Sequence, residues 1–294
     1  MDPAPRIATI MTCHNRRETT LACLGALASQ RHFREEDLFL VDDGSTDGTG
    51  DAVRSAYPSA HVITGDGTLF WSRGMNCAWA AALDAETCYD WYLWLNDDVL
   101  LDPGALDRLL ADARMCADPH EPLIIAGATL DGARERVTYG AHWQGNPRRP
   151  LRLELMVPGR VPQMATTVSG NAVLVSAPAQ EALGLFDPAF EHIYSELDYS
   201  LRAQAEGIPV MLAGEPVGVC EANDKLPRSS AASLPLASRL RARLQEDRRI
   251  HARDWRRMVA RHDGSPLGWL RHLVGPYLRL LSGRPSRHAE AREI

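Results

Sequence analysis

The stretch Trp91-Tyr92-Leu93-Trp94-Leu95-Asn96-Asp97-Asp98 decides the fold prediction, because an apolar run ends there in adjacent carboxylates. Its five apolar residues are typical of a strand that is buried on both faces of a sheet. Two carboxylates this close raise each other's pKa unless a cation lies between them. A hard divalent cation shared with phosphate oxygens is the usual partner, so the stretch indicates metal-bridged diphosphate binding. An ordinary acidic turn is the alternative, and a second acidic strand end, at residues 39–45, favours the metal.

Short apolar runs alternate with helical patterns along the first half of the chain. The rhythm predicts βαβ units, a mostly parallel sheet and right-handed crossovers. Pro103 is expected in the first turn of one helix, and Asp47 is expected to cap another. The expected strands are residues 7–11, 38–41, 61–63 and 91–95, and the expected helices are 18–29, 47–57, 72–85 and 103–116.

Polar clusters follow each of these strands. Ligands of parallel α/β sheets bind beyond the carboxyl ends of the strands. The coincidence therefore predicts a binding site at this edge of the sheet. The clusters are Thr12–Arg16, Asp42-Asp43, Gly65-Asp66-Gly67 and Asn96-Asp97-Asp98.

The second half of the chain changes rhythm. Hairpins and loops are expected at 128–168, strands at 172–175 and 208–212, and helices at 178–185 and 194–206, the last ended by Gly207. A loosely patterned stretch, 220–235, precedes one long basic helix at about 237–261. An amphipathic segment at 269–281 then presents Trp269, Leu270, Leu273, Val274, Tyr277, Leu278 and Leu281 on one face. This face is expected either to pack against the body of the protein or to lie in a membrane interface.

Charge is unevenly distributed along the 294 residues. The net charge is −6, but residues 239–294 hold 14 Arg against 6 Asp and Glu, so this tail is +8 and the remainder is −14. The acidic part disfavours nucleic acid as a partner, whereas the basic tail suits anionic lipid, nucleic acid, an acidic surface or plain solvation. Six cysteines without a Cys-x-x-Cys pair indicate reduced thiols in a cytosolic protein. Neither a signal peptide nor a bilayer-spanning segment is expected.

Common ion and phosphate loops do not fit this sequence. Residues 43–48 begin like a calcium loop, but Arg54 stands at position 12 and a strand precedes the loop. Gly65-Asp66-Gly67 is not a dinucleotide fingerprint, and no Walker sequence is present. A metal at Asp98 is the expected substitute.

Three segments, in this order, resemble the family 2 glycosyltransferases with the GT-A fold: Thr12–Arg16, Val41–Thr49 and Asn96–Asp98. The resemblance covers roughly residues 6–215. Residues 65–71 with Gly74-Met75-Asn76 resemble the bacterial subgroup that contains rhamnosyltransferase-like enzymes of surface polysaccharides. The resemblance implies an α/β GT-A fold, a mostly parallel sheet flanked by helices, with a C-terminal helical extension.

The resemblance also implies roles for residues at the first two strand ends. Thr12 and His14 would line the base pocket, where Asp43 would accept a hydrogen bond from the imide N–H of uracil or thymine. Asn15 and Arg16 would lie beside the nucleotide entrance.

Asn96-Asp97-Asp98 corresponds by this resemblance to the Asp-x-Asp motif. Asp98 would ligate Mg²⁺ or Mn²⁺, and the metal would bind both donor phosphates. Asn96 replaces the commoner first Asp, and Asp97 joins the same nucleotide-binding set. The residues implied to face the sugar or the phosphates are Asp66, Arg73 and Asn76.

The segment 191–202 resembles the Glu-Asp-x-Asp-Leu segment that supplies the catalytic base at a helix start. Glu196 would take the proton of the acceptor hydroxyl, and Asp198 would be a structural or acceptor-orienting carboxylate. A helix-terminal carboxylate favoured by the macrodipole is the alternative for Glu196. The family often has a histidine near Cys220, and this chain lacks it. The histidines considered as auxiliaries are His14, His142 and His192.

We therefore predict an inverting, metal-dependent hexosyltransferase that uses a nucleoside diphosphate sugar, dTDP- or UDP-linked, and a hydroxyl acceptor in surface polysaccharide or glycoconjugate synthesis. The acceptor would be a glycan or a lipid-linked glycan. A catalytically degenerate nucleotide-sugar or carbohydrate-binding protein is the alternative. A nucleotidyltransferase is disfavoured, because no Gly-rich loop follows the first strand.

The expected domains are 1–218, with a nucleotide-binding half 1–127 and an acceptor half 128–218, and a basic helical extension 219–294. The expected location is the cytoplasm, with peripheral contact at the inner face of a membrane or a homodimer formed through the C-terminal helices.

Overall fold

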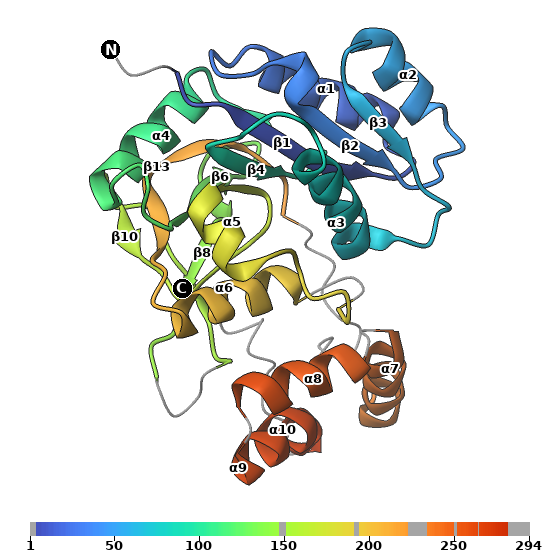
Figure 1. Ribbon diagram of the computed structural model, residues 1–294. Coiled ribbons are helices and arrows are strands. Elements are labelled where there is room, and N and C mark those ends of the chain that lie inside the picture. The colour runs from blue at the N-terminus through green and yellow to red at the C-terminus, as the bar shows by residue number, and fades with distance from the viewer. Residues whose placement is uncertain are drawn as a thin grey trace. The chain divides into compact units, whose positions relative to one another are not determined.

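The computed structural model describes residues 4–146, 151–190, 194–222, 234–249, 252–263 and 265–281. The chain divides into two compact units, which are described separately (Figure 1). The first comprises Met1–Gly145 and Leu153–Ala222, and the second comprises Asn146–Arg152 and Asn223–Ile294.

The first unit is built on one large sheet with the strand order β10-β13-β6-β12-β4-β1-β2-β3, to which β5 and β7 add at β13 and β6. Neighbours β4, β1, β2 and β3 are parallel, as the βαβ rhythm predicts. Strand β12 enters antiparallel between β4 and β6, and β6 is parallel to β13. A separate small sheet has the order β11-β8-β9.

The strands of the first unit are β1 (Ile7–Cys13), β2 (Leu38–Asp42), β3 (His61–Thr64), β4 (Trp91–Leu95), β5 (Leu100–Leu101), β6 (Ile124–Leu130), β7 (Val137–Tyr139), β8 (Ala141–Trp143), β9 (Glu154–Leu155), β10 (Gln163–Met164), β11 (Thr167–Val168), β12 (Ala172–Ser176) and β13 (Val210–Val219). Its helices are α1 (Arg17–Ala28), the short η1 (Glu35–Asp37), α2 (Thr49–Ala56), α3 (Phe70–Leu83), α4 (Ala105–Cys116), α5 (Ala177–Leu183) and α6 (Ser195–Ala205).

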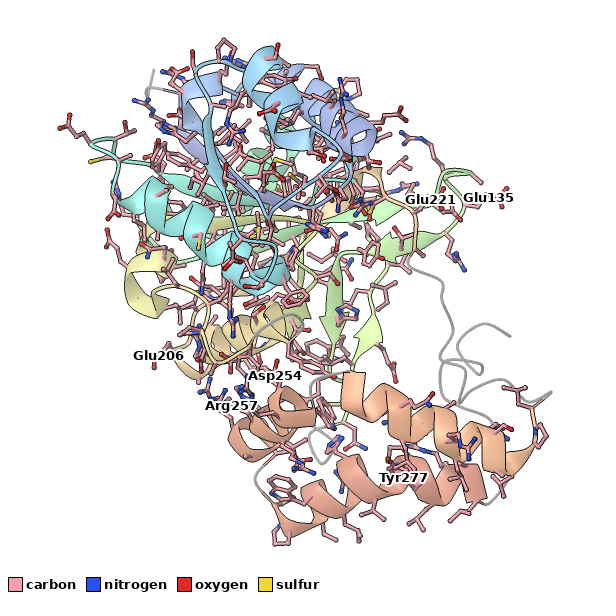
Figure 2. The ribbon with its side chains drawn as sticks, turned by 90° about the vertical axis from the view of Figure 1, so that its right-hand side faces the viewer. Glu135, Glu206, Glu221, Asp254, Arg257 and Tyr277 are labelled. Atoms are coloured by element: carbon pink, nitrogen blue, oxygen red, sulfur yellow. The ribbon has the colours of Figure 1, made fainter. Side chains whose placement is uncertain are left out.

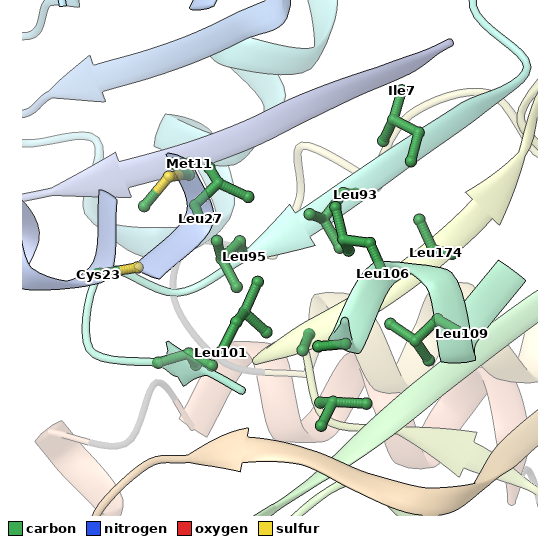
Figure 3. Packing of buried hydrophobic residues seen from close by; sticks show 14 of the residues in the cluster. Ile7, Met11, Cys23, Leu27, Leu93, Leu95, Leu101, Leu106, Leu109 and Leu174 are labelled. Atoms are coloured by element: carbon green, nitrogen blue, oxygen red, sulfur yellow. The ribbon is translucent and has the colours of Figure 1, made fainter. Parts of the chain in front are cut away.

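Both faces of the large sheet are buried, which explains the uninterrupted apolar run of β4. Successive side chains of a strand point to opposite faces. Leu93 and Leu95 therefore join the core cluster that contains Leu106 and Leu109 of α4 (Figure 3). Trp94 joins the opposite cluster, which contains residues of α3, α5 and α6.

Several predicted boundaries shift for local reasons. Helix α4 begins at Ala105 because Gly104 adopts a left-handed conformation with φ 70°, so Pro103 lies before the helix and its predicted place in the first turn is wrong. Helix α2 begins at Thr49 and its N-cap is Gly48, with φ 80°, so the predicted capping position of Asp47 is wrong by one residue, although its carboxylate accepts the Thr49 backbone N–H at 3.0 Å. Strand β13 extends to Val219, well beyond the predicted 208–212, because it pairs with β6 through register shifts and then with β5.

The second unit is helical. The prediction of one helix at 237–261 is wrong, since α7 (Leu236–Arg249) ends before α8 (Ala252–His262) begins. They are followed by α9 (Pro266–Trp269), the π-helical η3 (Leu270–Val274) and α10 (Gly275–Leu281). Asp254 and Arg257 lie on α8 and Tyr277 on α10 (Figure 2). The segment 191–193 and most of the stretch 220–235 lie outside the described residues.

The amphipathic face predicted for 269–281 is exposed. Trp269, Leu270, Val274, Leu278 and Leu281 are 37–57% exposed, whereas Leu280, outside the predicted face, is buried. Leu273 has no described side chain. Among the described helices, none combines the length and hydropathy that a bilayer-spanning segment requires.

Candidate functional site at the carboxyl ends of the strands

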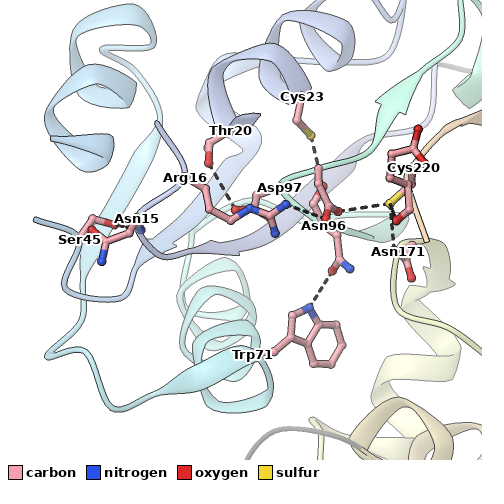
Figure 4. Close-up of polar contacts among 12 residues, drawn as sticks. Asn15, Arg16, Thr20, Cys23, Ser45, Trp71, Asn96, Asp97, Asn171 and Cys220 are labelled. Carbon is pink, nitrogen blue, oxygen red and sulfur yellow. Dashed lines mark hydrogen bonds and ion pairs between the residues drawn. The ribbon is translucent and has the colours of Figure 1, made fainter. Parts of the chain in front are cut away.

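The two carboxylates after β4 share one internal cation, the guanidinium of Arg16 (Figure 4). Arg16 follows β1, the neighbour of β4 in the sheet. Its Nη1 lies 3.1 Å from Asp97 Oδ1, and its Nη2 donates to Asp98 Oδ2 at 2.9 Å. The predicted need for a cation between these carboxylates is met, within the described residues, by a side chain that the sequence analysis placed only beside the nucleotide entrance.

Asp97 is the buried member of the pair, with 6% exposure. Burial raises the pKa of Asp97 to about 6, opposed by the positive charge of Arg16 and reinforced by Asp98. Thr20 of α1 donates to the other oxygen of Asp97 at 3.4 Å. The carboxylate of Asp97 thus faces α1 and Arg16.

Asp98 is the more accessible member, with 28% of its side chain exposed. While Arg16 holds Oδ2, the Cys220 thiol donates to Oδ1 at 3.4 Å. Burial and the negative charge of Asp98 raise the pKa of Cys220 to about 12, so the sulfur is a neutral thiol near neutral pH. Asn171 donates to the same sulfur at 3.6 Å and fixes its position.

Asn96 is oriented from three sides. Its side-chain oxygen accepts the indole N–H of Trp71 at 2.7 Å, and its backbone bonds to Asn171 and Cys23. Trp71 lies against Gly170, where an added Cβ would come 2.5 Å from the indole ring. The carboxylate of a commoner Asp is thus replaced by an amide that accepts from a tryptophan.

Residues that follow β1 form hydrogen bonds with the loop that follows β2. Asn15 donates its backbone N–H to Ser45 Oγ at 2.8 Å and accepts from the Thr46 backbone at 2.7 Å. His14 Nδ1 lies 2.5 Å from the carbonyl oxygen of Asp43, and His14 Nε2 lies 2.9 Å from the Asn15 amide nitrogen. These contacts fit the tautomer with its proton on Nδ1, and they hold the loop after β2 against the end of β1.

Asp43 anchors the loop that leads into α3. Its carboxylate is only 4% exposed and accepts the backbone N–H groups of Gly67, Leu69 and Phe70 at 2.8 to 3.0 Å. The Asp43 carboxylate thus takes the place of water as the acceptor for three backbone N–H groups. These hydrogen bonds fix a loop that has no regular secondary structure. The base contact implied by the resemblance stays a prediction.

The remaining predicted binding residues are placed less uniformly. Thr12 packs closely against Gly74 of α3. A Cβ atom added at Gly74 would lie only 2.3 Å from the Thr12 hydroxyl oxygen. Asp66 is exposed, and hydrogen bonds from Thr68 lower its pKa. Asn76 uses both ends of its amide on the backbone of Phe186, at 2.9 and 3.1 Å, so it ties α3 to the segment after α5. Arg73 is half-buried on α3 and interacts electrostatically with Asp66.

Helix α6 carries both predicted catalytic carboxylates, and they differ sharply. Asp198 is fully buried and accepts from Arg202 at 3.0 Å, while Arg202 also donates to the carbonyl groups of Leu183 and Leu185. This network supports the structural role of Asp198. The acceptor-orienting role stays a prediction.

Glu196 lies in the first turn of α6, and its predicted role as the catalytic base stays a prediction. Strand pairing makes β13 parallel to β6 and, through antiparallel β12, parallel to β4. Helix α6 leads into β13 through Gly207, which has φ 74°. Burial raises the pKa of Glu196.

The donor set fits a metal shared with a ligand. Among the described residues, no group of three or more His, Cys, Asp or Glu side chains is arranged to hold an ion. Magnesium-like cations are commonly bound by one or two carboxylates plus substrate phosphates. Asp98, half-exposed beside Asp97, matches that pattern, whereas a site built from protein ligands alone does not.

The sequence of this edge matches a known family. Residues 9–153 match the family model described as "Glycosyl transferase family 2". The chain carries a family 2 glycosyltransferase domain. Over 226 residues the enzyme is 28% identical to the N-acetylglucosaminyl-diphospho-decaprenol L-rhamnosyltransferase of Mycobacterium tuberculosis, from either of two strains. That alignment covers 70% of this glycosyltransferase and 72% of the relative.

Solved structures share its architecture. The mannosyltransferase PcManGT from Pyrobaculum calidifontis, in complex with GDP-Man and Mn²⁺, aligns with a TM-score of 0.50 at 16% identity and 78% coverage of this chain. TarS 1-349 of S. aureus aligns with a TM-score of 0.51 at 15% identity and 74% coverage. This chain spans 60% of each of those chains. The likeness confirms the predicted GT-A fold.

Two contacts at the site could not be predicted from the sequence. Arg16 lies 82 residues from Asp98, and Cys220 lies 122 residues from it. The only indication that Cys220 lies at the site was its position, because the family often has a histidine near this residue. No local pattern predicts that its thiol donates to Asp98.

Proposed function

We propose that this glycosyltransferase moves a sugar from a nucleoside diphosphate sugar to a hydroxyl acceptor with inversion of the anomeric centre. One observation carries the proposal. The loops after β1, β2 and β4 are tied together by their own polar side chains at the carboxyl ends of these parallel strands. That edge is where open α/β sheets bind ligands.

Each chain group has a definite task in this reaction. Glu196 accepts the proton of the acceptor hydroxyl as the oxygen attacks the anomeric carbon, and its burial makes the carboxylate a stronger base than a solvated one. Asp43 and Asn15 hold the loops that surround the nucleotide. Asp98 would hold Mg²⁺ or Mn²⁺ together with phosphate oxygens, and such a cation supplies positive charge to the departing diphosphate.

The donor and acceptor are proposed from the relative's name. That relative is named for an L-rhamnosyl group transferred to an N-acetylglucosaminyl-diphospho-decaprenol. We infer a dTDP- or UDP-linked deoxyhexose or hexose as the donor, and a lipid-linked glycan as the acceptor, used in the cytoplasm at the inner face of a membrane. The exposed Trp269, Leu270 and Leu278 of the second unit, among many arginines, suit contact with an anionic membrane.

The test begins with nucleotide binding. Calorimetry of UDP, dTDP, GDP and CMP with and without Mn²⁺ is expected to show one nucleoside diphosphate bound at least tenfold more tightly with the metal. Asp98→Ala is expected to remove that metal dependence, while Asp107→Ala, a carboxylate on the exposed face of α4, is expected to keep it.

Transfer and stereochemistry follow from the product. Proton NMR of the product made from the preferred donor is expected to show the anomeric configuration opposite to that of the donor. Binding of nucleotide that ignores both chelator and Asp98→Ala would remove the metal from the proposal. A protein that binds the donor but neither transfers nor hydrolyses its sugar would leave only the degenerate binding protein.

A further inference from the structure

Arg16 lies directly beside the carboxylate that is proposed to bind a metal cation. Its guanidinium spans both carboxylates that the proposed function assigns to metal and nucleotide binding, at 3.1 Å from Asp97 and 2.9 Å from Asp98. The side chain itself is 44% exposed. It is thus an accessible cation held on a carboxylate that is expected to ligate another cation.

Both oxygens of Asp98 already accept a donor from the chain. Oδ2 accepts from Arg16 and Oδ1 from the thiol of Cys220. Cys220 is 1% exposed and is fixed by Asn171, so it has little room to leave. Arg16, on the exposed side of the carboxylate, is the donor that can move.

A divalent cation on Asp98 makes the present position of Arg16 unfavourable. Two cations held on the same carboxylate repel each other strongly at the effective dielectric constant typical of protein surfaces, and the repulsion from a divalent ion is about twice that from a monovalent one. Oδ2 of Asp98 would also have to serve both cations. The guanidinium therefore needs another anion nearby when the metal binds.

The formal charges identify that anion. Asp97, Asp98 and Arg16 together carry one net negative charge. A divalent cation alone makes the cluster positive, and a diphosphate alone makes it more negative. The cation and the two charges of a sugar-linked diphosphate together return the cluster to one net negative charge, and a guanidinium is well matched to phosphate oxygens through paired N–H donors.

We infer that Arg16 is an exchangeable counter-ion that couples metal binding to diphosphate binding. It pairs with Asp97 and Asp98 in the absence of ligand, and when a divalent cation and a nucleoside diphosphate bind it transfers its hydrogen bonds from Asp98 to the phosphate oxygens. The inference rests on the proposed metal site at Asp98. It goes beyond that site by predicting that metal and nucleotide each bind weakly alone and strongly together.

The test measures Mn²⁺ uptake by the full-length protein with electron paramagnetic resonance of the free ion, with and without UDP or dTDP. For the wild type, saturating nucleotide is expected to raise the Mn²⁺ affinity at least tenfold, and Mn²⁺ is expected to raise the nucleotide affinity by the same factor because binding linkage is reciprocal. This measurement needs no variant.

Variants then locate the coupling. Arg16→Gln is expected to bind Mn²⁺ alone about tenfold more tightly than the wild type, to bind the nucleotide alone more weakly, and to show coupling at least threefold weaker than that of the wild type, the remainder coming from direct contact between metal and phosphate. Arg16→Lys keeps the charge but cannot bridge two carboxylates as a planar fork, so an intermediate coupling is expected. Arg17→Gln is the matched control, since Arg17 is exposed and its backbone N–H, not its side chain, bonds to Asp47. It is expected to behave as the wild type.

The outcomes separate the two proposals. If the wild type takes up Mn²⁺ with nucleotide but Arg16→Gln shows unchanged coupling, or no gain in Mn²⁺ affinity alone, the counter-ion exchange is wrong while the metal site stands. If Arg17→Gln reproduces the effect of Arg16→Gln, general electrostatics replaces the exchange. If the wild type takes up no Mn²⁺ even with either nucleotide, both the metal site and the exchange are overturned.

Discussion

Glu196 is a carboxylate whose predicted task can be tested by its charge alone. Glu196→Gln keeps the shape of the side chain and removes the base, so kcat is expected to fall by about 10² to 10⁴-fold with little change in KM. Steady-state kinetics with the preferred donor measures this change. Glu206→Gln, at the other end of the same helix (Figure 2), is the control and is expected to retain activity.

The pH dependence of the wild type follows from the burial of Glu196. The base must be ionised, and burial raises its pKa above the ordinary value for glutamate. Activity is therefore expected to be full above this raised pKa and to fall as the pH decreases through it. The midpoint should lie at a higher pH than that of a solvated glutamate. A kcat that survives Glu196→Gln within about threefold would show that another group takes the proton.

Individual residues were predicted unevenly from the sequence. The acidic strand end at Asp97 and Asp98 could be recognised because an apolar run and its polar end are adjacent in the chain. The partner of that pair could not, because Arg16 reaches it only through the pairing of β1 with β4. The burial that raises the pKa of Asp97 to about 6 likewise depends on α1 packing over the strand end.

At the scale of elements, the conformation of the loop between β3 and α3 depends on the carboxylate of Asp43, which follows β2. Asp43→Ala removes the acceptor of three backbone N–H groups, so it is expected to lower the free energy of unfolding by about 3 kcal/mol, since each unsatisfied buried donor costs about 1 to 3 kcal/mol. Urea denaturation measures the loss. Asp66→Ala is the control in the same loop. Its exposed carboxylate accepts only from Thr68 among the described hydrogen bonds, and a cost below about 1 kcal/mol is expected.

Nucleotide binding distinguishes the anchoring role of Asp43 from direct base recognition. Loss of a loop anchor is expected to weaken all nucleoside diphosphates by similar factors, whereas loss of an imide contact changes the preference between uracil or thymine and guanine. Equal stability losses for Asp43→Ala and Asp66→Ala would contradict the anchoring role.

Elements that obey local periodicity were predicted well, and those set by remote pairing were not. Helix α1 and strand β4 follow from their own sequences. Strand β13 was predicted too short, because its last residues are held by β6 and β5 rather than by a strong local pattern. The single long basic helix was also wrong, since the polar and arginine-rich sequence of 237–261 fits helix throughout and gives little local indication of where α7 ends.

At the scale of the whole molecule, the two units are expected to have separable tasks. Both core clusters lie between Ile7 and Cys220, so a chain that ends at Ala222 is expected to unfold cooperatively and to bind the nucleotide. The full chain is expected to sediment with anionic vesicles in a salt-sensitive manner, because arginines attract anionic lipid and exposed apolar side chains insert. The shortened chain is expected to stay in solution.

Point variants refine the vesicle measurement. Leu270→Glu and Leu278→Glu together replace exposed apolar side chains of the second unit and are expected to reduce vesicle binding at least fivefold without changing nucleotide affinity. Equal sedimentation of the full and shortened chains, or binding only to neutral vesicles, would contradict membrane contact through this unit. A concentration-dependent dimer that dissociates in the same variants would instead assign the face to a second copy.

The sequence by itself determined the alternation of strands and helices, the buried strand that ends in two carboxylates, and the resemblance to the family, because each depends on residues that are neighbours in the chain. Only the tertiary structure decided which side chain forms ion pairs with those carboxylates and that Cys220 donates to Asp98. It also decided that the side chains of Asp43 and Asn76 form hydrogen bonds with backbone groups. These contacts join residues 24 to 122 positions apart. They exist because the sheet order places β4 beside β1 and brings β13 back to the same edge, an arrangement set by burial of both sheet faces rather than by any local pattern.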